Sequence, residues 1–230
     1  MRPIKIWLVC VAIVVVAVAS YRAIPHVLYG KRIAGKVVDA DTGAPIGGVH
    51  VAFLWESDIT PRGFTAHNSR TICYHAAATV TDAQGQFQIE PWREWSTYGV
   101  DVVEPIALVY ARDYAPRQIA VRGNQAGRPT DHPVERYTLK RFTGSAAERI
   151  DAMFWGVVSR DCRYGGGSQK SLYPMLRDVH AEAKEIARSE QQRSTVSAIA
   201  LIAAKAAIAL DPTGPGNDSG VEEFIEGNLK

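Results

Sequence analysis

Two residues have a spacing that zinc sites use, because His132 and Glu135 form a His-x-x-Glu pattern. Zinc catalysis needs three protein ligands and an open position for water or substrate. The sequence places no third ligand, and Pro133 interrupts the pattern just before the last predicted strand. We therefore interpret His132 as an exposed loop residue and Glu135 as a strand-edge residue. No metal, no cofactor and no catalytic residue is predicted.

A glycine-rich stretch from Gly165 to Ser171 ends in Lys-Ser, as phosphate-binding loops do. Such a loop also requires glycine at two further positions and a strand that leads into it. Tyr164 and Gln169 occupy those two positions in this chain. We predict that the stretch is a connector before a helix.

The first 22 residues have the features of a targeting segment. Arg2 and Lys5 precede an uncharged apolar run, Ile6 to Ala19, that ends in small residues typical of a cleavage site. As a helix this run reaches about 21 Å, short of the roughly 30 Å of a bilayer core, which favours cleavage near Ala19. Aromatic residues at both ends, Trp7 and Tyr21, favour an uncleaved anchor. Both outcomes export the body of the chain to the periplasm and make the membrane a partner of the N-terminal segment.

The composition is that of a globular protein, with 47% hydrophobic and 22% charged residues in 230. Arg2 and Lys5 are two of the 26 Lys and Arg residues, so the chain without these two has as many basic as acidic residues, 24 of each. A neutral body gives no electrostatic reason to bind nucleic acid, and we predict no nucleic-acid partner.

Cys73 and Cys162 are the two cysteines of the exported body. An oxidising compartment favours a disulfide over two free thiols. We predict the bridge Cys73–Cys162, which would stabilise the fold by about 4 to 5 kcal/mol in the chain-entropy model. The alternatives are two separate buried thiols, or a metal site that combines Cys73 with His67 and His75.

The strongest candidate for a binding function combines the stretch from Asp58 to Tyr74 with Trp92 and Trp95. A long polar loop inside a domain is either functional or tied down. Aromatic residues on the end loops of a sandwich commonly bind a partner surface or a sugar. We therefore expect His67, Tyr74 and the two tryptophans to contact an envelope protein or a carbohydrate. The alternative is that these rings cap the sandwich.

Alternation of apolar and polar residues from Arg32 onward predicts strands joined by Asp/Gly turns. Ala76 to Thr81 and Gln86 to Ile89, with the turn Asp82 to Gly85 between them, form the clearest predicted hairpin. Further strands are expected at Ile33 to Val37, Val49 to Phe53, Val100 to Val103, Ile106 to Ala111, Gln118 to Val121 and Arg136 to Leu139. About seven short strands predict a Greek-key β-sandwich, so the chain is mainly β.

This order of strands and turns resembles the carboxypeptidase regulatory-like domain over residues 32–141. The resemblance rests on Gly35-x-Val37-x-Asp39, Thr42-Gly43-x-Pro45-Ile46-x-Gly48-Val49-x-Val51, Thr81-Asp82-x-x-Gly85-x-Phe87 and Val109-x-Ala111-x-x-Tyr114-x-Pro116. It implies a transthyretin-like (prealbumin-like) sandwich, in a non-catalytic module of exported and surface proteins. Asp113 stands where that family usually has glycine, a position that Asp tolerates in the left-handed region. The insertion Glu56 to Tyr74 is longer than the family pattern.

Beyond Arg141 the apolar residues recur with a helical period. Ser145 and Glu148 have capping-box spacing, and Pro174 suits the first turn of a second helix. A third helix, Thr195 to Leu210, is apolar nearly all round and should be buried between the sandwich and the other helices. The predicted organisation is a signal or anchor at 1–22, a linker at 23–31, the sandwich at 32–141, a helical segment at 142–212 and a tail at 213–230.

These observations predict a non-enzymatic, exported cell-envelope protein whose β-sandwich acts as a binding or structural module. One alternative is a periplasmic inhibitor or immunity-type protein, in which the long loop plugs a toxin or a hydrolase. A second alternative is a metal-dependent hydrolase that uses His132 and Glu135.

Overall fold

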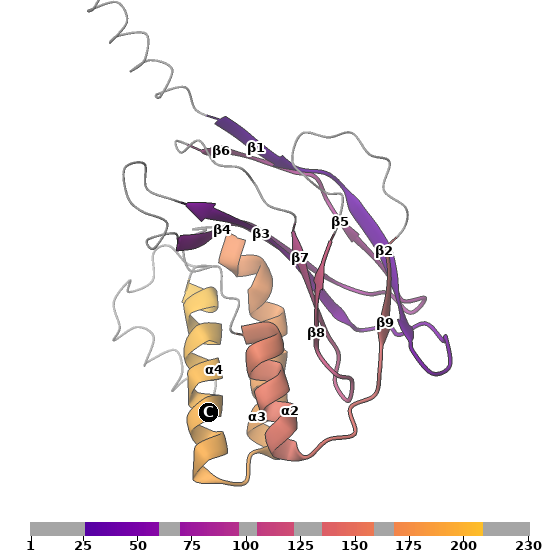
Figure 1. Ribbon diagram of the computed structural model, residues 1–230, viewed down its shortest axis with the longest axis vertical. Helices are drawn as coiled ribbons and strands as arrows, with labels where there is room; N and C mark the ends of the chain where they lie inside the picture. The colour runs from indigo at the N-terminus through magenta and orange to yellow at the C-terminus, as the bar shows by residue number, and fades with distance from the viewer. Residues whose placement is uncertain (1–25, 60–69, 97–104, 122–134, 159–167, 209–230) are drawn as a thin grey trace, which may run out of the picture.

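The computed structural model describes residues 26–59, 70–96, 105–121, 135–158 and 168–208 (Figure 1). The described residues form a β-rich structure in three layers. A layer of helices covers one face of a four-stranded sheet, and a three-stranded sheet covers the other face. This arrangement is compatible with the predicted β-sandwich followed by a helical segment.

The smaller sheet has the strand order β5 (Gln86–Ile89), β2 (Ile33–Asp39) and β9 (Glu135–Leu139). β2 is antiparallel to β5 and parallel to β9. A two-stranded ribbon, β1 (His26–Gly30) and β6 (Trp92–Ser96), continues the β2–β5 pairing in the same register. Residues 26–30 therefore form a paired strand, whereas the sequence analysis assigned them to a linker. The misassignment arose because the strand partner is more than sixty residues away.

The larger sheet has the strand order β4 (Arg70–Val80), β3 (His50–Ile59), β7 (Ile106–Tyr110) and β8 (Arg117–Ala120), with antiparallel neighbours throughout. Its central strand β3 is buried on both faces. Val51, Phe53 and Trp55 pack between the two sheets, and Ala52 and Leu54 pack under the helices. Burial on both faces explains why this strand reads as a continuous apolar run rather than an alternating one.

The helical layer begins at α2 (Ala146–Met153), where the predicted capping box of Ser145 and Glu148 is present. A π-helical turn follows, and a 3₁₀ turn precedes α3. These elements and the last two helices are η2 (Phe154–Val158), η3 (Ser168–Leu172), α3 (Tyr173–Ile186) and α4 (Glu190–Ile208). Pro174 lies in the first turn of α3, as predicted.

The helix α4 begins five residues before the predicted Thr195, at Glu190. Ser189 and Gln192 bond each other reciprocally before this start. The Ser189 Oγ accepts from the Gln192 N–H at 3.3 Å, and the Gln192 Oε1 accepts from the Ser189 N–H at 2.9 Å. This is a second capping box, which sets the start earlier than the apolar pattern alone indicates. Val196, Ile199 and Ala203 are buried, as expected for this helix, in the core that the helices share with the larger sheet.

The predicted hairpin across Asp82 to Gly85 is wrong in its pairing, although its turn is present. β4 pairs with β3, and β5 pairs with β2, so the chain changes sheets at this turn. Thr81 holds the larger sheet, because its N–H donates to the Val49 carbonyl at 2.9 Å. Gly85 joins the smaller sheet, because its carbonyl accepts from the Val37 N–H at 2.8 Å. Local turn chemistry is the same whether the flanking strands pair or separate, so it could not reveal the change of sheet.

The expected loop from Glu56 to Tyr74 is instead mostly strand. β3 continues to Ile59 and β4 begins at Arg70, so the two form a long hairpin. Trp55 pairs with His75 and Glu56 with Cys73, which leaves Tyr74 as the extra residue of a β-bulge. The polar residues of this segment lack the apolar alternation that was used to predict strands, so the extension of the hairpin was not predicted.

Two turn predictions are confirmed by the backbone. Asp113 has φ of 67°, in the left-handed region expected at that position. Asp39 accepts hydrogen bonds at Oδ1 from the backbone N–H groups of Asp41 and Thr42, both at 2.9 Å, and at Oδ2 from the Tyr114 hydroxyl at 3.0 Å. Asp39 thus fastens the turn after β2 to the chain after β7.

The predicted strand Val100 to Val103, the N-terminal targeting segment and the C-terminal tail lie outside the described residues. Within the described ranges, no helix has both the length and the apolar character needed to cross a membrane.

Candidate functional site

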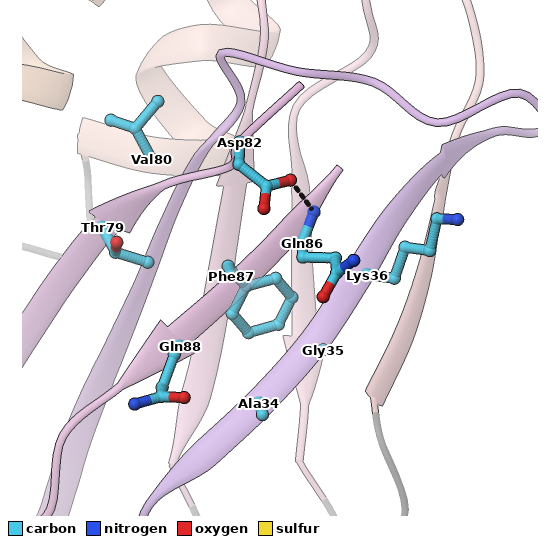
Figure 2. A pocket seen from close by; sticks show the side chains of 9 residues that line it. All are labelled: Ala34, Gly35, Lys36, Thr79, Val80, Asp82, Gln86, Phe87 and Gln88. Atoms are coloured by element: carbon cyan, nitrogen blue, oxygen red, sulfur yellow. Dashed lines mark hydrogen bonds between the residues drawn. The ribbon is translucent and has the colours of Figure 1, made fainter. Parts of the chain in front are cut away.

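A groove with a volume of about 490 Å³ lies where the edge strands of the two sheets, β4 and β5, come together (Figure 2). Its lining comes from β2, β4, β5 and the turn between the last two: Ala34, Gly35, Lys36, Thr79, Val80, Asp82, Gln86, Phe87 and Gln88. The volume falls in the range of clefts that hold ligands. Both strands that border the groove are sheet edges within the described residues.

The strand β5 presents backbone polar groups on its outer side. The hydrogen bond from Val37 to Gly85 fixes the phase of the β2–β5 ladder, so the backbone groups of Phe87 and Ile89 face β2. Those of Gln86 and Gln88 consequently face away from β2. Asp82 uses the Gln86 groups, because its N–H donates to the Gln86 carbonyl at 2.9 Å and its Oδ1 accepts from the Gln86 N–H at 2.8 Å (Figure 2).

The strand β4 has the same alternation on its own edge. The hydrogen bond from the Thr81 N–H to the Val49 carbonyl shows which β4 residues pair with β3. The backbone N–H and carbonyl of Thr79 point toward β3, and those of Ala78 and Val80 point away from it. The bond from the Ser171 hydroxyl to the Ala76 carbonyl, at 2.9 Å, agrees with this phase and places η3 against the first part of the edge. Beyond it, Val80 is one of three large apolar side chains that are exposed within the described residues, with 47% of its surface accessible.

Within the described residues, the edge beside the groove carries none of the charged or proline residues that usually protect edge strands. Residues 76–80 read Ala-Ala-Ala-Thr-Val, with no charge and no proline. Natural proteins commonly place lysine, proline or a covering element on an exposed edge, because open backbone groups pair with other strands. Here η3 bonds the edge at Ala76, Ala78 packs against the core under the helices, and Thr79 and Val80 border the groove.

The opposite side of the two sheets is built differently. Arg117 of β8 donates from Nη1 to the Thr138 carbonyl of β9 at 3.0 Å, and this bond links the two edges. Charged side chains stand on both strands there: Arg117 on β8, and Glu135 and Arg136 on β9. Within the described residues, the β8–β9 side is thus charged and cross-linked, whereas the groove lining holds one positive and one negative residue, Lys36 and Asp82.

Charges in the groove are few and balanced. Lys36 and Asp82 carry opposite signs and belong to the lining, together with the uncharged amides of Gln86 and Gln88. A strongly acidic or basic partner would therefore gain little here. The lining fits a partner that is itself uncharged and rich in hydrogen-bonding groups.

The predicted partner-binding residue Trp92 is a core residue. It is 9% exposed, and its ring stacks on that of His75 with centroids 4.1 Å apart and meets Trp55 edge-on at 5.2 Å. The indole also covers Gly30, where an added Cβ would lie 1.9 Å from the Trp92 Nε1. Trp92 therefore caps the core between the sheets, which was the alternative interpretation, because its ring faces are occupied by neighbours.

Two of the other predicted partner-binding residues, Tyr74 and Trp95, lie in strands. Tyr74 is the bulged residue of β4, and Trp95 lies in β6 opposite Val27. His67 lies outside the described residues. The groove that we describe shares none of these residues, and a partner site that includes them stays a prediction.

Cys73 is disulfide-bonded. It is buried at 5% exposure in the core between the larger sheet and the helices. Its Sγ lies 3.4 Å from the His75 carbonyl, a contact without a hydrogen bond because a disulfide sulfur carries no proton. Cys162 lies outside the described residues, so the pairing Cys73–Cys162 stays a prediction.

The His-x-x-Glu pattern and the glycine-rich stretch were the two sequence patterns considered for zinc binding and phosphate binding. Glu135 is the first residue of β9 and pairs with Gly35, whereas His132 and the glycines at 165–167 lie outside the described residues. Among the described side chains, no three His, Cys, Asp or Glu residues stand close enough to hold a metal ion.

A buried ion pair joins the helices to the larger sheet. Arg149 of α2 and Glu182 of α3 are 4% and 6% exposed, and the guanidinium donates from Nε at 2.8 Å and from Nη2 at 3.1 Å to the two carboxylate oxygens. Arg149 also donates to the carbonyls of Ala111 and Tyr114, and Tyr110 donates to Glu182 at 2.6 Å. Burial, and then the hydrogen bond to Glu182, raise the pKa of the Tyr110 hydroxyl.

Arg149 and Glu182 each hydrogen-bond to other protein groups, and neither residue belongs to the groove lining. Next to it, the His50 Nε2 lies 2.8 Å from the Asp178 Oδ2, which ties β3 to α3. We interpret these contacts as structural, since they satisfy groups that the packing of helices on the sheet has buried.

Sequence reasoning missed the groove and the buried ion pair. The uncharged segment Ala76 to Val80 was the available signal for the groove, but it was interpreted as a hairpin strand. No local pattern marked Arg149 and Glu182 as partners, because 33 residues separate them and each also fits a solvent-exposed helix face.

No protein-family model and no curated protein matches the chain. Among solved structures, a streptococcal ancillary pilin is similar at 11% identity and a TM-score of 0.27, over 51% of this chain and 31% of that one. The 3-chlorocatechol 1,2-dioxygenase of Rhodococcus opacus is similar at 14% identity and a TM-score of 0.29, over 52% and 62%. The catechol 1,2-dioxygenase of Acinetobacter radioresistens is similar at 17% identity and a TM-score of 0.26, over 50% and 53%. The chain spans less than two thirds of each of these proteins, and at such scores none assigns it to a family or an activity.

Proposed function

We propose that this chain is a non-enzymatic binding module of the cell envelope, with a carboxypeptidase regulatory-like sandwich of transthyretin type. In this proposal residues 1–22 direct the chain out of the cytoplasm, and the sandwich then acts in the periplasm. The helical segment is a permanent part of the module, held by the Arg149–Glu182 pair and the core that it shares with the larger sheet.

The observation that carries the proposal is the groove between β4 and β5. It combines a cleft of about 490 Å³, backbone groups of Val80 that face away from β3, and a lining with one positive and one negative residue. The strongly buried charged groups described above are instead engaged with one another, so they support a structural role. The groove can bind without any chemical step, which fits a module that recruits or supports a partner.

A site-specific photo-crosslinker tests this proposal in the native envelope. The crosslinking amino acid replaces Gln88, whose exposed side chain lines the groove. The matched control places the same amino acid at Ala120, an exposed residue on the opposite edge strand β8. We expect a discrete crosslinked product from position 88 and none from position 120. Equal labelling from both positions, or no product from either, would refute a binding role for the groove.

A further inference from the structure

We propose that the groove binds an extended, uncharged peptide segment of a partner protein, which adds as a fifth strand to the larger sheet beside β4. This inference rests on the proposed binding function and specifies the class of ligand. Main-chain hydrogen bonds would supply affinity, and the pockets beside alternate side chains would supply selectivity.

The backbone geometry provides the hydrogen-bonding half of the argument. Ala78 and Val80 each direct an N–H and a carbonyl away from β3, as the Thr81–Val49 bond requires. An antiparallel or parallel strand at the usual spacing of about 4.8 Å would pair with these groups. The Ser171 hydroxyl of η3 occupies the outward Ala76 carbonyl, so the proposed pairing would begin beyond that bond.

The side chains provide the second half of the argument. On β4, Thr79 lies on the face that packs toward the smaller sheet, because its pairing partner Val51 is in the core between the sheets. An added strand would direct alternate side chains toward the same side, where Phe87 and Gln88 form the other wall of the groove. We expect small apolar or hydroxyl side chains at that position. The exposed Val80 would be covered on the other face.

Charge decides which segment fits. The edge has no charged residue from Ala76 to Val80, and the lining holds one positive and one negative group, Lys36 and Asp82. A charged strand would lose hydration here without a counter-ion that faces it along the edge, whereas an uncharged strand would lose little. The protected side at β8 and β9 shows the contrast, because its charged residues disfavour strand addition.

The probe is a phage-displayed library of random heptapeptides, selected on the purified full chain in detergent. Selected peptides are synthesised with and without N-methylation at alternate residues, since N-methylation removes backbone donors and leaves the side chains unchanged. We expect selected sequences to be uncharged and rich in β-branched residues, and N-methylation on the pairing side to weaken binding at least tenfold. N-methylation of the residues whose N–H groups point away from β4 should weaken binding less.

The variants test the location. Val80→Pro removes an outward N–H that the β3–β4 ladder does not use, and should weaken binding at least tenfold. Val80→Thr retains that N–H and should bind within about threefold of the wild type. Ala120→Pro makes the equivalent change on the β8 edge, where the Val121–Pro105 bond fixes the phase, and should bind as the wild type does.

The wild-type chain and the methylated peptides decide the question even if a proline variant does not fold. The proposal is overturned if no peptide is selected, if N-methylation has no effect in either phase, or if the best probes are charged. The proposal would also be overturned if the wild-type chain forms dimers and Val80→Pro abolishes them, because the β4 edge would then bind a second copy of the chain. If one of these outcomes is found but a partner crosslinks at position 88, the proposed binding function stands and only the peptide as ligand is refuted. If position 88 gives no crosslink, the binding function itself fails.

Discussion

Replacement of Glu182 by Gln should destabilise the protein far more than replacement of its neighbour Glu185 by Gln. Both residues lie on α3 and both pair with arginine, Glu182 with Arg149 and Glu185 with Arg112. The first pair has side chains only 5% and 7% exposed, whereas the second pair is 59% and 61% exposed. The two substitutions remove the same charge from the same helix, so they differ mainly in burial.

The expected magnitudes follow from that difference. Removing one partner of a buried pair leaves an uncompensated charge and typically costs about 3 to 5 kcal/mol. An exposed pair contributes about 0 to 1 kcal/mol. In a protein of this size, about 3 kcal/mol corresponds to a decrease in Tm of roughly 6 to 12 °C. Glu182→Gln should therefore produce a large shift and Glu185→Gln almost none.

A double substitution separates the loss of the pair from the presence of an unpaired charge. Arg149→Met combined with Glu182→Leu removes both charges, and should recover most of the stability lost by Glu182→Gln, because well-packed apolar residues often replace a buried pair without loss. Tyr110 then keeps an acceptor in the Asp178 carbonyl, which lies 3.3 Å from its hydroxyl.

Urea unfolding followed by tryptophan fluorescence reads out these free energies, because Trp55 and Trp92 are buried in the sandwich core. If Glu182→Gln and Glu185→Gln both cost less than about 1 kcal/mol, the buried pair does not hold the helices to the sheet. If the double variant is as unstable as Glu182→Gln alone, the stability came from packing that the substitution disturbed rather than from the unpaired charge.

Three further predictions concern the turns and the disulfide. Hydrogen bonds from Thr42, and then from Tyr114 and Asp41, lower the pKa of Asp39 below its ordinary 3.8. The Asp39 carboxylate therefore stabilises the fold above pH 3.8, and this contribution is lost as the pH falls through the lower pKa of the folded state. The difference in unfolding free energy between wild type and Asp39→Asn, measured with urea, should shrink in acid. Gly85→Ala should destabilise more than Gly43→Ala in the same assay, because both have positive φ but only the Cβ at 85 would meet backbone, 2.5 Å from the Val37 carbonyl oxygen. Cys73→Ser should lower the Tm, and dithiothreitol should lower the Tm of wild type without affecting that variant.

Local signals in the sequence predicted the features that depend on a few neighbouring residues. The capping box at Ser145, the proline at position 174 and the left-handed Asp113 were each correct, because the chemistry that fixes them lies within four residues. The apolar run of α4 correctly predicted a helix, but only one face of it is buried, and Leu201 on another face is 41% exposed. Its start at Glu190 was missed because the box of Ser189 and Gln192 precedes the apolar run.

Features set by distant residues were not accessible in the same way. The turn at Asp82 joins two sheets because Thr81 binds Val49 and Gly85 binds Val37, and neither contact is visible in the turn itself. The same reasoning explains why β1 was taken for a linker, since only its pairing with β6 makes it a strand. The groove depends on both of these long-range arrangements, so no motif marked it.

Topology nevertheless limits where the proposed partner strand could bind. Apolar cores cover both faces of the larger sheet, one shared with the helices and the other with the smaller sheet. Access to its backbone is therefore confined to the two edge strands, β4 and β8. At β8, Arg117 links the edge to Thr138 of β9 and adds charge. At β4, the Ser171 hydroxyl of η3 bonds the Ala76 carbonyl, and the uncharged residues Thr79 and Val80 border a cleft. Within the described residues, β4 combines outward-facing backbone groups with a cleft beside them, so we expect substitutions there, rather than on β8, to impair the proposed binding.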